Sequence, residues 1–247
     1  MIKTAVILAA GMGKRLKTIT QAKPKGFIPV NNKTLIEISI AKLFSSGIDK
    51  VIIGTGYLSK FYEKLSNDYD QIECVRNVNF KSTGSMFTLY NLKSKISGDF
   101  ILLESDLLYE KRGIRILIED RHSDIILSSE KTGSGDEVYI EVDKENNLVN
   151  LSKDKSDLKN IDSELVGISK ITYRTFILMC DFAEKEFKLS PKLDYEYALV
   201  GISKKVPVFV KKIEDYIWAE VDDENHLKRM QNEISPKIEE REAYEKN

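Results

Sequence analysis

Residues 8–16 read Leu8-Ala9-Ala10-Gly11-Met12-Gly13-Lys14-Arg15-Leu16 and directly continue the apolar run Thr4 to Leu8. A short apolar run that ends in glycine is typical of a buried strand. Glycine lets main-chain N–H groups approach an anion closely, and Lys14 and Arg15 can neutralise its charge. The stretch therefore predicts a strand followed by a phosphate-binding loop, although an ordinary strand-to-helix turn would also explain two glycines.

Two familiar phosphate-binding motifs do not fit this loop. A P-loop needs four residues between its glycines and a Gly-Lys-Ser/Thr ending, and a dinucleotide-binding loop needs a third glycine where Leu16 stands. If the loop binds phosphate, it therefore belongs to another class of phosphate site.

The composition indicates a globular α/β protein rather than a binding tail. Of the 247 residues 42% are apolar, and 38 Lys and Arg face 39 Asp and Glu for a formal net charge of −1. This balance favours neither nucleic acid nor anionic membranes as a partner. Met1 to Leu8 is too short for a signal peptide and no later run approaches a membrane span, so we expect a cytoplasmic protein. Cys74 and Cys180 are expected to be buried thiols.

Apolar runs alternate with helical periodicity along the first half of the chain. The helical stretch Thr34 to Ser46 places Ile36, Ile40 and Leu43 on one face. Strand and helix repeated in this way predict an α/β fold with a Rossmann-like, mostly parallel sheet. The expected strands are Thr4 to Leu8, Lys50 to Gly54, Ile72 to Val75, Phe100 to Glu104 and Asp124 to Ser128.

The sequence pattern changes in the middle of the chain. Val138 to Val142 and Leu148 to Leu151 flank a turn-rich segment, which indicates a hairpin. We therefore expect one domain over residues 1–240 with an inserted antiparallel flap around residues 130–170. Residues 241–247 are mostly charged and are expected to form a tail.

The glycine loop is followed ten residues later by Lys23-Pro24-Lys25-Gly26. This pair of motifs resembles the sugar-nucleotidyltransferase superfamily, whose members open with a strand, a Leu-Ala-Ala-Gly-x-Gly-x-Arg loop and a downstream Pro-Lys. The resemblance implies that the loop, residues Leu8, Ala9, Ala10, Gly11, Met12, Gly13 and Lys14, holds a nucleoside triphosphate. It also implies that Arg15 and Lys25 stabilise charge at the α-phosphate.

Two further segments are candidates for contacts with the base and ribose. Lys81-Ser82-Thr83-Gly84-Ser85-Met86 resembles the superfamily's segment at this site, and Thr83, Gly84 and Ser85 are the expected contacts. Thr83 or Ser85 is also expected to cap the following helix, which would be a purely structural role. Gly54 ends another parallel strand, where ligands of open α/β sheets bind.

Two acids follow apolar strands where the superfamily binds its metal. Asp106 follows Phe100 to Glu104, and Asp222 follows Trp218 to Val221. An acid after a strand is commonly only a turn residue, but carboxylates are the ligands that Mg²⁺ prefers. The resemblance therefore implies a Mg²⁺ site at Asp106 and Asp222, with Asp106 also at the nucleotide. Transfer would be an in-line attack of an acceptor oxyanion on the α-phosphorus, with no protein nucleophile.

From residue 1 to about 240 the chain resembles the 2-aminoethylphosphonate cytidylyltransferases. The segments that carry this resemblance are residues 103–107, 134–139, 164–170 and 218–222. It implies CTP as the donor and a small amine-bearing phosphonate or phosphate as the acceptor. Carboxylates suit a primary ammonium because its N–H groups donate to them. Candidate acceptor contacts are Asp136, Glu137, Lys153, Tyr195, Glu196 and Glu220.

Several alternatives stay open at this point. Trp218 and Tyr139 leave room for a partial aromatic cage, so phosphocholine is the runner-up acceptor. A sugar 1-phosphate acceptor and an inactive nucleotide-binding relative are weaker alternatives. A homodimer and fusion to an aminotransferase are both compatible with the resemblance.

Overall fold

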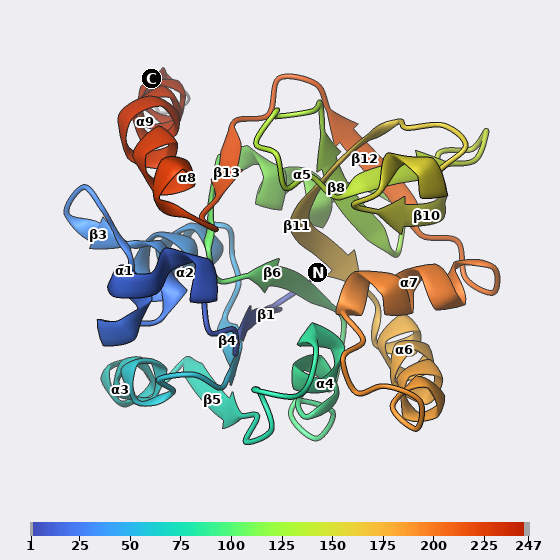
Figure 1. Cartoon of the computed structure of the whole chain (residues 1–247), viewed down its shortest axis with the longest axis horizontal. Helices are drawn as coiled ribbons and strands as arrows, with labels where there is room; N and C mark the ends of the chain where they lie inside the picture. The colour runs from blue at the N-terminus through green and yellow to red at the C-terminus, as the bar shows by residue number, and fades with distance from the viewer. Residues whose placement is uncertain (1, 245–247) are drawn as a thin grey trace.

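The structure, a computed structural model, describes residues 2–244 and is built on a mixed sheet of nine strands (Figure 1). These strands are β1 (Thr4–Ala9), β4 (Lys50–Thr55), β5 (Ile72–Arg76), β6 (Phe100–Glu104), β8 (Ile125–Ser129), β9 (Tyr139–Val142), β10 (Leu148–Ser152), β11 (Ser163–Ile171) and β12 (Phe209–Ile213). Two small antiparallel pairs lie outside the sheet, β2 (Pro29–Val30) with β3 (Lys33–Thr34) and β7 (Leu107–Tyr109) with β13 (Trp218–Glu220).

The sheet has a parallel half and a mixed half, in which β12 pairs with β8 in parallel. Its strand order is β10-β9-β11-β6-β1-β4-β5, and β8 pairs with both β11 and β12. Strands β6, β1, β4 and β5 are parallel, whereas β11 runs antiparallel to β6, β8 and β9. The hairpin β9–β10 lies within the expected flap region. The predicted α/β fold with an inserted antiparallel portion is therefore confirmed.

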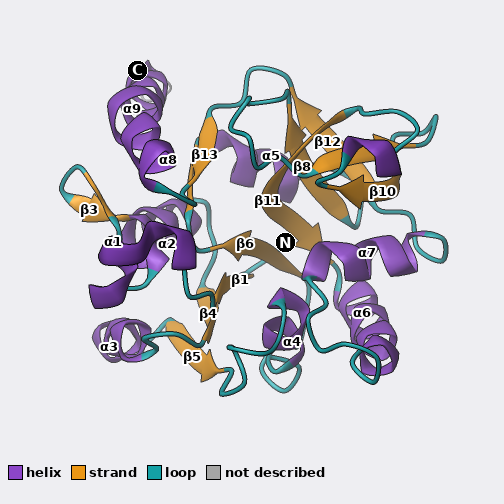
Figure 2. Ribbon diagram, in the orientation of Figure 1, coloured by secondary structure: helices purple, strands orange, loops and turns teal. Residues whose placement is uncertain are grey.

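Helices cover both faces of the sheet (Figure 2). Alternate residues of β1 point to opposite cores, so that Ala5 and Ile7 pack with α2, α3 and α5, while Val6 and Leu8 pack with α4, α6 and α7. The helices are α1 (Lys17–Ala22), α2 (Leu35–Ser45), α3 (Lys60–Asp68), α4 (Ser85–Tyr90), α5 (Arg112–Glu119), α6 (Tyr173–Glu186), α7 (Tyr195–Ser203), α8 (Glu224–Arg229) and α9 (Ser235–Tyr244). None of those in the described chain combines the length and apolar character needed to span a bilayer.

Helix α2 shows how local sequence sets an element boundary. The Thr34 hydroxyl accepts a hydrogen bond from the Glu37 N–H, and the Glu37 carboxylate accepts one from the Thr34 N–H at 2.8 Å. This reciprocal capping box satisfies two N–H groups that the helix itself cannot pair. The predicted apolar face of α2, including Ile36, Ile40 and Leu43, is buried.

The C-terminal helix α9 is anchored by buried charges. The Arg241 Nε lies 3.2 Å from an oxygen of Glu110, whose side chain is 1% exposed, and Glu242 accepts from Lys42 Nζ at 2.6 Å. Residues 241–244 of the expected tail are therefore helical, and residues 245–247 lie outside the described part of the chain.

Candidate active site

Two adjoining pockets lie beyond the carboxyl ends of β1 and β6. We call the first the glycine-loop pocket; of the predicted nucleotide contacts its wall contains Leu8, Ala9, Ala10, Gly11, Gly13, Thr83, Gly84, Ser85 and Asp106, together with Lys25. We call the second the acidic pocket; its wall contains Asp136, Glu164, Gly167, Trp218, Glu220 and Asp222. Glu104, Lys153 and Glu196 border both pockets.

The glycine loop requires its second glycine for two reasons. Gly13 has φ +58°, a left-handed conformation that L side chains rarely adopt. A Cβ atom at Gly13 would also lie 2.8 Å from Cγ2 of Thr20 and 3.0 Å from Cγ of Lys25. The loop therefore brings its main chain close to the stem of Lys25.

Three predicted nucleotide contacts lie away from the wall of the glycine-loop pocket. Met12 and Lys14 are in the loop but do not line the pocket. Gly54 lies inside β4, where a Cβ would be 2.7 Å from Cγ2 of Thr88. The structure thus gives Gly54 a packing role, because its missing side chain lets α4 approach the sheet.

The two predicted metal ligands meet although they are 116 positions apart in the chain. Strand β13 pairs with β7, and the Val221 N–H donates to the Asp106 carbonyl at 3.1 Å. This pairing places the acids that flank the two strands side by side. Lys25 Nζ then bridges them, at 2.7 Å from Asp106 Oδ2 and 2.7 Å from Asp222 Oδ1.

The two predicted catalytic cations are both held by carboxylates. Arg15 Nη2 lies 2.7 Å from Asp136 Oδ2 and 2.8 Å from Asp222 Oδ1. Burial by itself would lower the pKa of Lys25, but the carboxylates of Asp106 and Asp222 outweigh burial and raise it. Lys25 is therefore a fixed positive charge at the mouth of the glycine loop.

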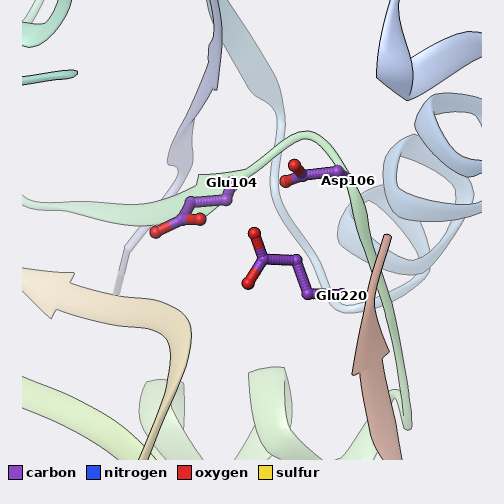
Figure 3. Close-up of side chains that lie close together, drawn as sticks. All are labelled: Glu104, Asp106 and Glu220. Atoms are coloured by element: carbon purple, nitrogen blue, oxygen red, sulfur yellow. The ribbon is translucent and has the colours of Figure 1, made fainter. Parts of the chain in front are cut away.

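Glu104 forms a cluster of acids with Asp106 and Glu220, and the sequence analysis did not predict Glu104 as a site residue. Oxygens of Glu104, Asp106 and Glu220 lie within 4.8 Å of one another, and the three side chains converge (Figure 3). Burial, followed by the neighbouring carboxylates, raises the pKa of both Glu104 and Glu220 well above its usual range. The available signal for Glu104 was its place at the end of a buried strand two residues before Asp106.

The donor set fits a magnesium ion at Asp106 and Asp222. Both groups offer carboxylate oxygens, the ligand type that Mg²⁺ prefers. The Lys25 ammonium already stands as a cation between them, at 2.7 Å from each. Asp106 and Asp222 would therefore hold the ion, with Glu104 and Glu220 as nearby carboxylates.

The N-terminus of α4 is capped by a residue that lies far away in the sequence. The expected cap from Thr83 or Ser85 is wrong, since the N-cap residue is Gly84 and makes no side-chain cap. Instead the Asp194 carboxylate accepts from both the Ser85 N–H at 2.8 Å and the Ser85 hydroxyl at 3.0 Å. The Thr83 hydroxyl is bonded to the Asn79 carbonyl.

The predicted acceptor contacts divide into two groups. Asp136, Lys153, Glu196 and Glu220 line the acidic pocket. Glu137 does not; it accepts from the Gly135 N–H and lies within 3.3 Å of the Tyr139 hydroxyl. Tyr195 is buried behind the wall and donates to Glu104 at 2.9 Å, so its contact is with a pocket residue.

Neighbouring groups affect two of the predicted acceptor-binding residues, Asp136 and Glu196. Asp136 is already paired, with Arg15 on one oxygen and Lys153 at 2.8 Å on the other. Burial, and then the charge of Asp194, raise the pKa of Glu196 to about 7. Among the described residues, no Lys or Arg lies within ion-pair distance of Glu220. The Glu220 carboxylate can therefore form an ion pair with an entering cation.

Aromatic surface in the acidic pocket is limited to one large ring. Among the described residues of its wall, Trp218 is the only Trp, Tyr or Phe. Its indole N–H donates to the Ser129 hydroxyl at 2.8 Å, and the residue is 5% exposed. Tyr139 is not part of the wall.

Comparisons with known proteins agree with this geometry. Residues 4–125 match the family model described as nucleotidyl transferase. A choline-phosphate cytidylyltransferase from Streptococcus pneumoniae is 33% identical over 106 residues, 43% of this chain and 46% of the relative. A CTP:phosphoglutamine cytidylyltransferase from Campylobacter jejuni is 25% identical over 185 residues, 69% of this chain and 73% of the relative. The chain is thus similar in sequence to nucleotidyltransferases.

A solved structure shares the fold over almost all of this chain. The inositol-1-phosphate CTP transferase from T. maritima superposes with a TM-score of 0.82 at 20% identity, covering 97% of both chains. By contrast, the sequence matches span only 41% to 49% of the length of the first four curated relatives.

Proposed function

We propose that the chain is a magnesium-dependent cytidylyltransferase that transfers CMP from CTP to 2-aminoethylphosphonate and releases pyrophosphate. The observation that carries this proposal is the Lys25 bridge between Asp106 and Asp222, at the mouth of the glycine loop. It puts a cation suited to bind phosphate beside two carboxylates suited to bind a metal ion, as transfer at an α-phosphate requires.

The transfer needs no nucleophilic side chain. A phosphonate oxygen of the acceptor attacks the α-phosphorus and forms the new P–O bond, while the bond from that phosphorus to the β-phosphate oxygen breaks. Bound Mg²⁺ would supply charge neutralisation on the triphosphate. The glycine-loop N–H groups orient the phosphates, and Arg15 and Lys25 stabilise the negative charge that develops on the α-phosphate oxygens.

The choice of CTP is supported by the activities of the relatives. The Streptococcus and Campylobacter proteins are both cytidylyltransferases. Their acceptors differ, so they support the donor more strongly than any one acceptor.

The acidic pocket favours an acceptor that carries a primary ammonium. Burial and neighbouring carboxylates raise the pKa of Glu220, so an entering cation relieves an unfavourable cluster of acids. An ammonium donates hydrogen bonds to carboxylates, whereas a trimethylammonium group has no N–H to donate and is bound by aromatic cages. The wall offers one such ring, Trp218. Phosphocholine remains the second candidate because the Streptococcus relative acts on it.

A pyrophosphate-release assay tests the proposal directly. CTP, UTP, ATP and dTTP would each be combined with 2-aminoethylphosphonate, phosphocholine, phosphoethanolamine or glucose 1-phosphate in the presence of Mg²⁺. We expect the highest kcat/KM with CTP and 2-aminoethylphosphonate. No turnover with any of the acceptors, or turnover only with glucose 1-phosphate, would overturn the assignment.

Substituting Glu220→Gln is expected to raise the KM for 2-aminoethylphosphonate about 10- to 100-fold, the worth of one hydrogen bond to a charged group. Ethylphosphonate lacks the amine, so its KM should stay the same. Glu137→Gln is the matched control, because Glu137 lies in the flap but outside the pocket wall. An equal loss with both acceptors would remove Glu220 from amine recognition.

A further inference from the structure

We propose that a divalent metal ion and the Lys25 ammonium compete for the carboxylates of Asp106 and Asp222, which Lys25 bridges. The inference rests on the proposed use of metal at this site. It assigns to Lys25 a second role, that of a built-in counter-ion exchanged when the substrate arrives.

The contacts of Lys25 are those of an enclosed ion pair. Its Nζ lies 2.7 Å from one oxygen of each acid, and the side chains of Lys25, Asp106 and Asp222 are 14%, 12% and 6% exposed. The same Asp222 oxygen also pairs with Arg15 at 2.8 Å. Both acids are thus neutralised by the protein's own cations.

A metal ion that binds Asp106 Oδ2 and Asp222 Oδ1 cannot share these two oxygens with the ammonium. Mg²⁺ binds carboxylate oxygens at about 2.0–2.1 Å and demands near-octahedral geometry. An ammonium between the same two oxygens occupies that space and repels the ion. Moving Lys25 without replacing the cation would leave the buried Asp106 carboxylate uncompensated and Asp222 with Arg15 alone, so the exchange is expected to be concerted.

The stem of Lys25 indicates where the released ammonium goes. Its Cγ and Cε lie 3.0 and 3.4 Å from the position of a Cβ on Gly13, so the stem runs along the glycine loop. The loop is the expected triphosphate site, and phosphate oxygens there would receive the displaced cation. A metal entering with the triphosphate therefore provides both the replacement cation and the new partner of Lys25.

This exchange predicts that metal alone binds weakly and that metal and nucleotide bind cooperatively. By linkage, removing the competing ammonium should strengthen binding of the metal alone. The same change should reduce the cooperativity, because no cation then needs to be moved.

Manganese binding to the nucleotide-free protein, followed by electron paramagnetic resonance of free Mn²⁺, tests the competition. Lys25→Met should lower the Kd for Mn²⁺ about tenfold, within the usual range of coupling between linked ligands. Lys25→Arg keeps the charge and should resemble the wild type. Lys153→Met is the matched control, since it removes a cation of the same site that binds Asp136 and neither metal ligand; a change below about threefold is expected for this weaker, longer-range effect.

Unchanged or weaker Mn²⁺ binding by a folded Lys25→Met variant would overturn the inference, as would equal gains in Lys25→Met and Lys153→Met. A measurement on the wild type covers the case in which Lys25→Met does not fold. Reductive methylation of Lys25, read by mass spectrometry against exposed Lys14, should rise when Mn²⁺ is added, and no rise at saturating Mn²⁺ would overturn the inference. Failure of Mn²⁺ to bind the wild type even with CTP would overturn the metal-dependent function as well.

Discussion

The variant Asp106→Asn should retain its fold and lose about 10³-fold in kcat, the upper end of the loss seen when one charged contact to a transition state is removed. Asp106 is 8% exposed, and its carboxylate accepts from Lys25 and converges with Glu104 and Glu220. The amide keeps the shape of the side chain but removes its charge, so the metal site and the placement of Lys25 are both weakened. Steady-state pyrophosphate release measures the effect.

The matched control for this variant is Asp49→Asn. Asp49 pairs with Lys3 at the surface, with 67% of its side chain exposed, and should leave kcat unchanged. Thermal unfolding of both variants separates catalysis from stability. If Asp106→Asn kept more than about a tenth of wild-type kcat, a residue stabilising the transition state would be ruled out at this position.

The variant Gly84→Ala is expected to lower the free energy of unfolding by about 3 kcal/mol, the upper end for overpacking a well-packed region. A Cβ on Gly84 would lie 2.2 Å from the Leu193 carbonyl oxygen and 2.7 Å from the Lys192 carbonyl carbon. These are backbone atoms, so the loop that carries Asp194 must move. Asp194 caps α4 at the glycine-loop pocket, and CTP binding should weaken along with stability.

Gly98→Ala serves as the control, because a Cβ at that position meets no atom within 4 Å. Urea unfolding gives the stability difference and calorimetry gives the CTP affinity. Equal stability of Gly84→Ala and Gly98→Ala would show that the contact between Gly84 and the 191–194 loop is not tight in solution.

Local sequence predicted the elements whose signals are local. Apolar runs located β1, β4, β5 and β6, and the capping pair Thr34 and Glu37 agrees with the predicted start of α2. The place of Asp106 and Asp222 after strands was also visible, but only the pairing of β7 with β13 shows that they share one lysine. The family resemblance linked these distant acids, because no periodicity in the sequence does so.

The remaining features depend on contacts between distant segments. The cap of α4 comes from Asp194, 109 residues after Ser85, which no local pattern indicates. A glycine indicates a close approach but does not show which residue approaches, and at Gly54 that residue is Thr88. Likewise, Asp136 stays a predicted amine contact, but no local pattern shows that it pairs with Arg15 and Lys153. Contacts of this kind are visible only in the folded chain.

The anchoring of α9 has a practical consequence for protein engineering. Glu110 receives the Arg241 guanidinium on one oxygen, and its other oxygen accepts from Arg112 and from the Ile217 N–H. Ile217 immediately precedes the strand that carries Glu220 toward Asp222. Removing the residues from Arg241 onward would therefore disturb the contacts that hold the strand carrying Glu220. A reporter domain is better attached through a linker beyond residue 244.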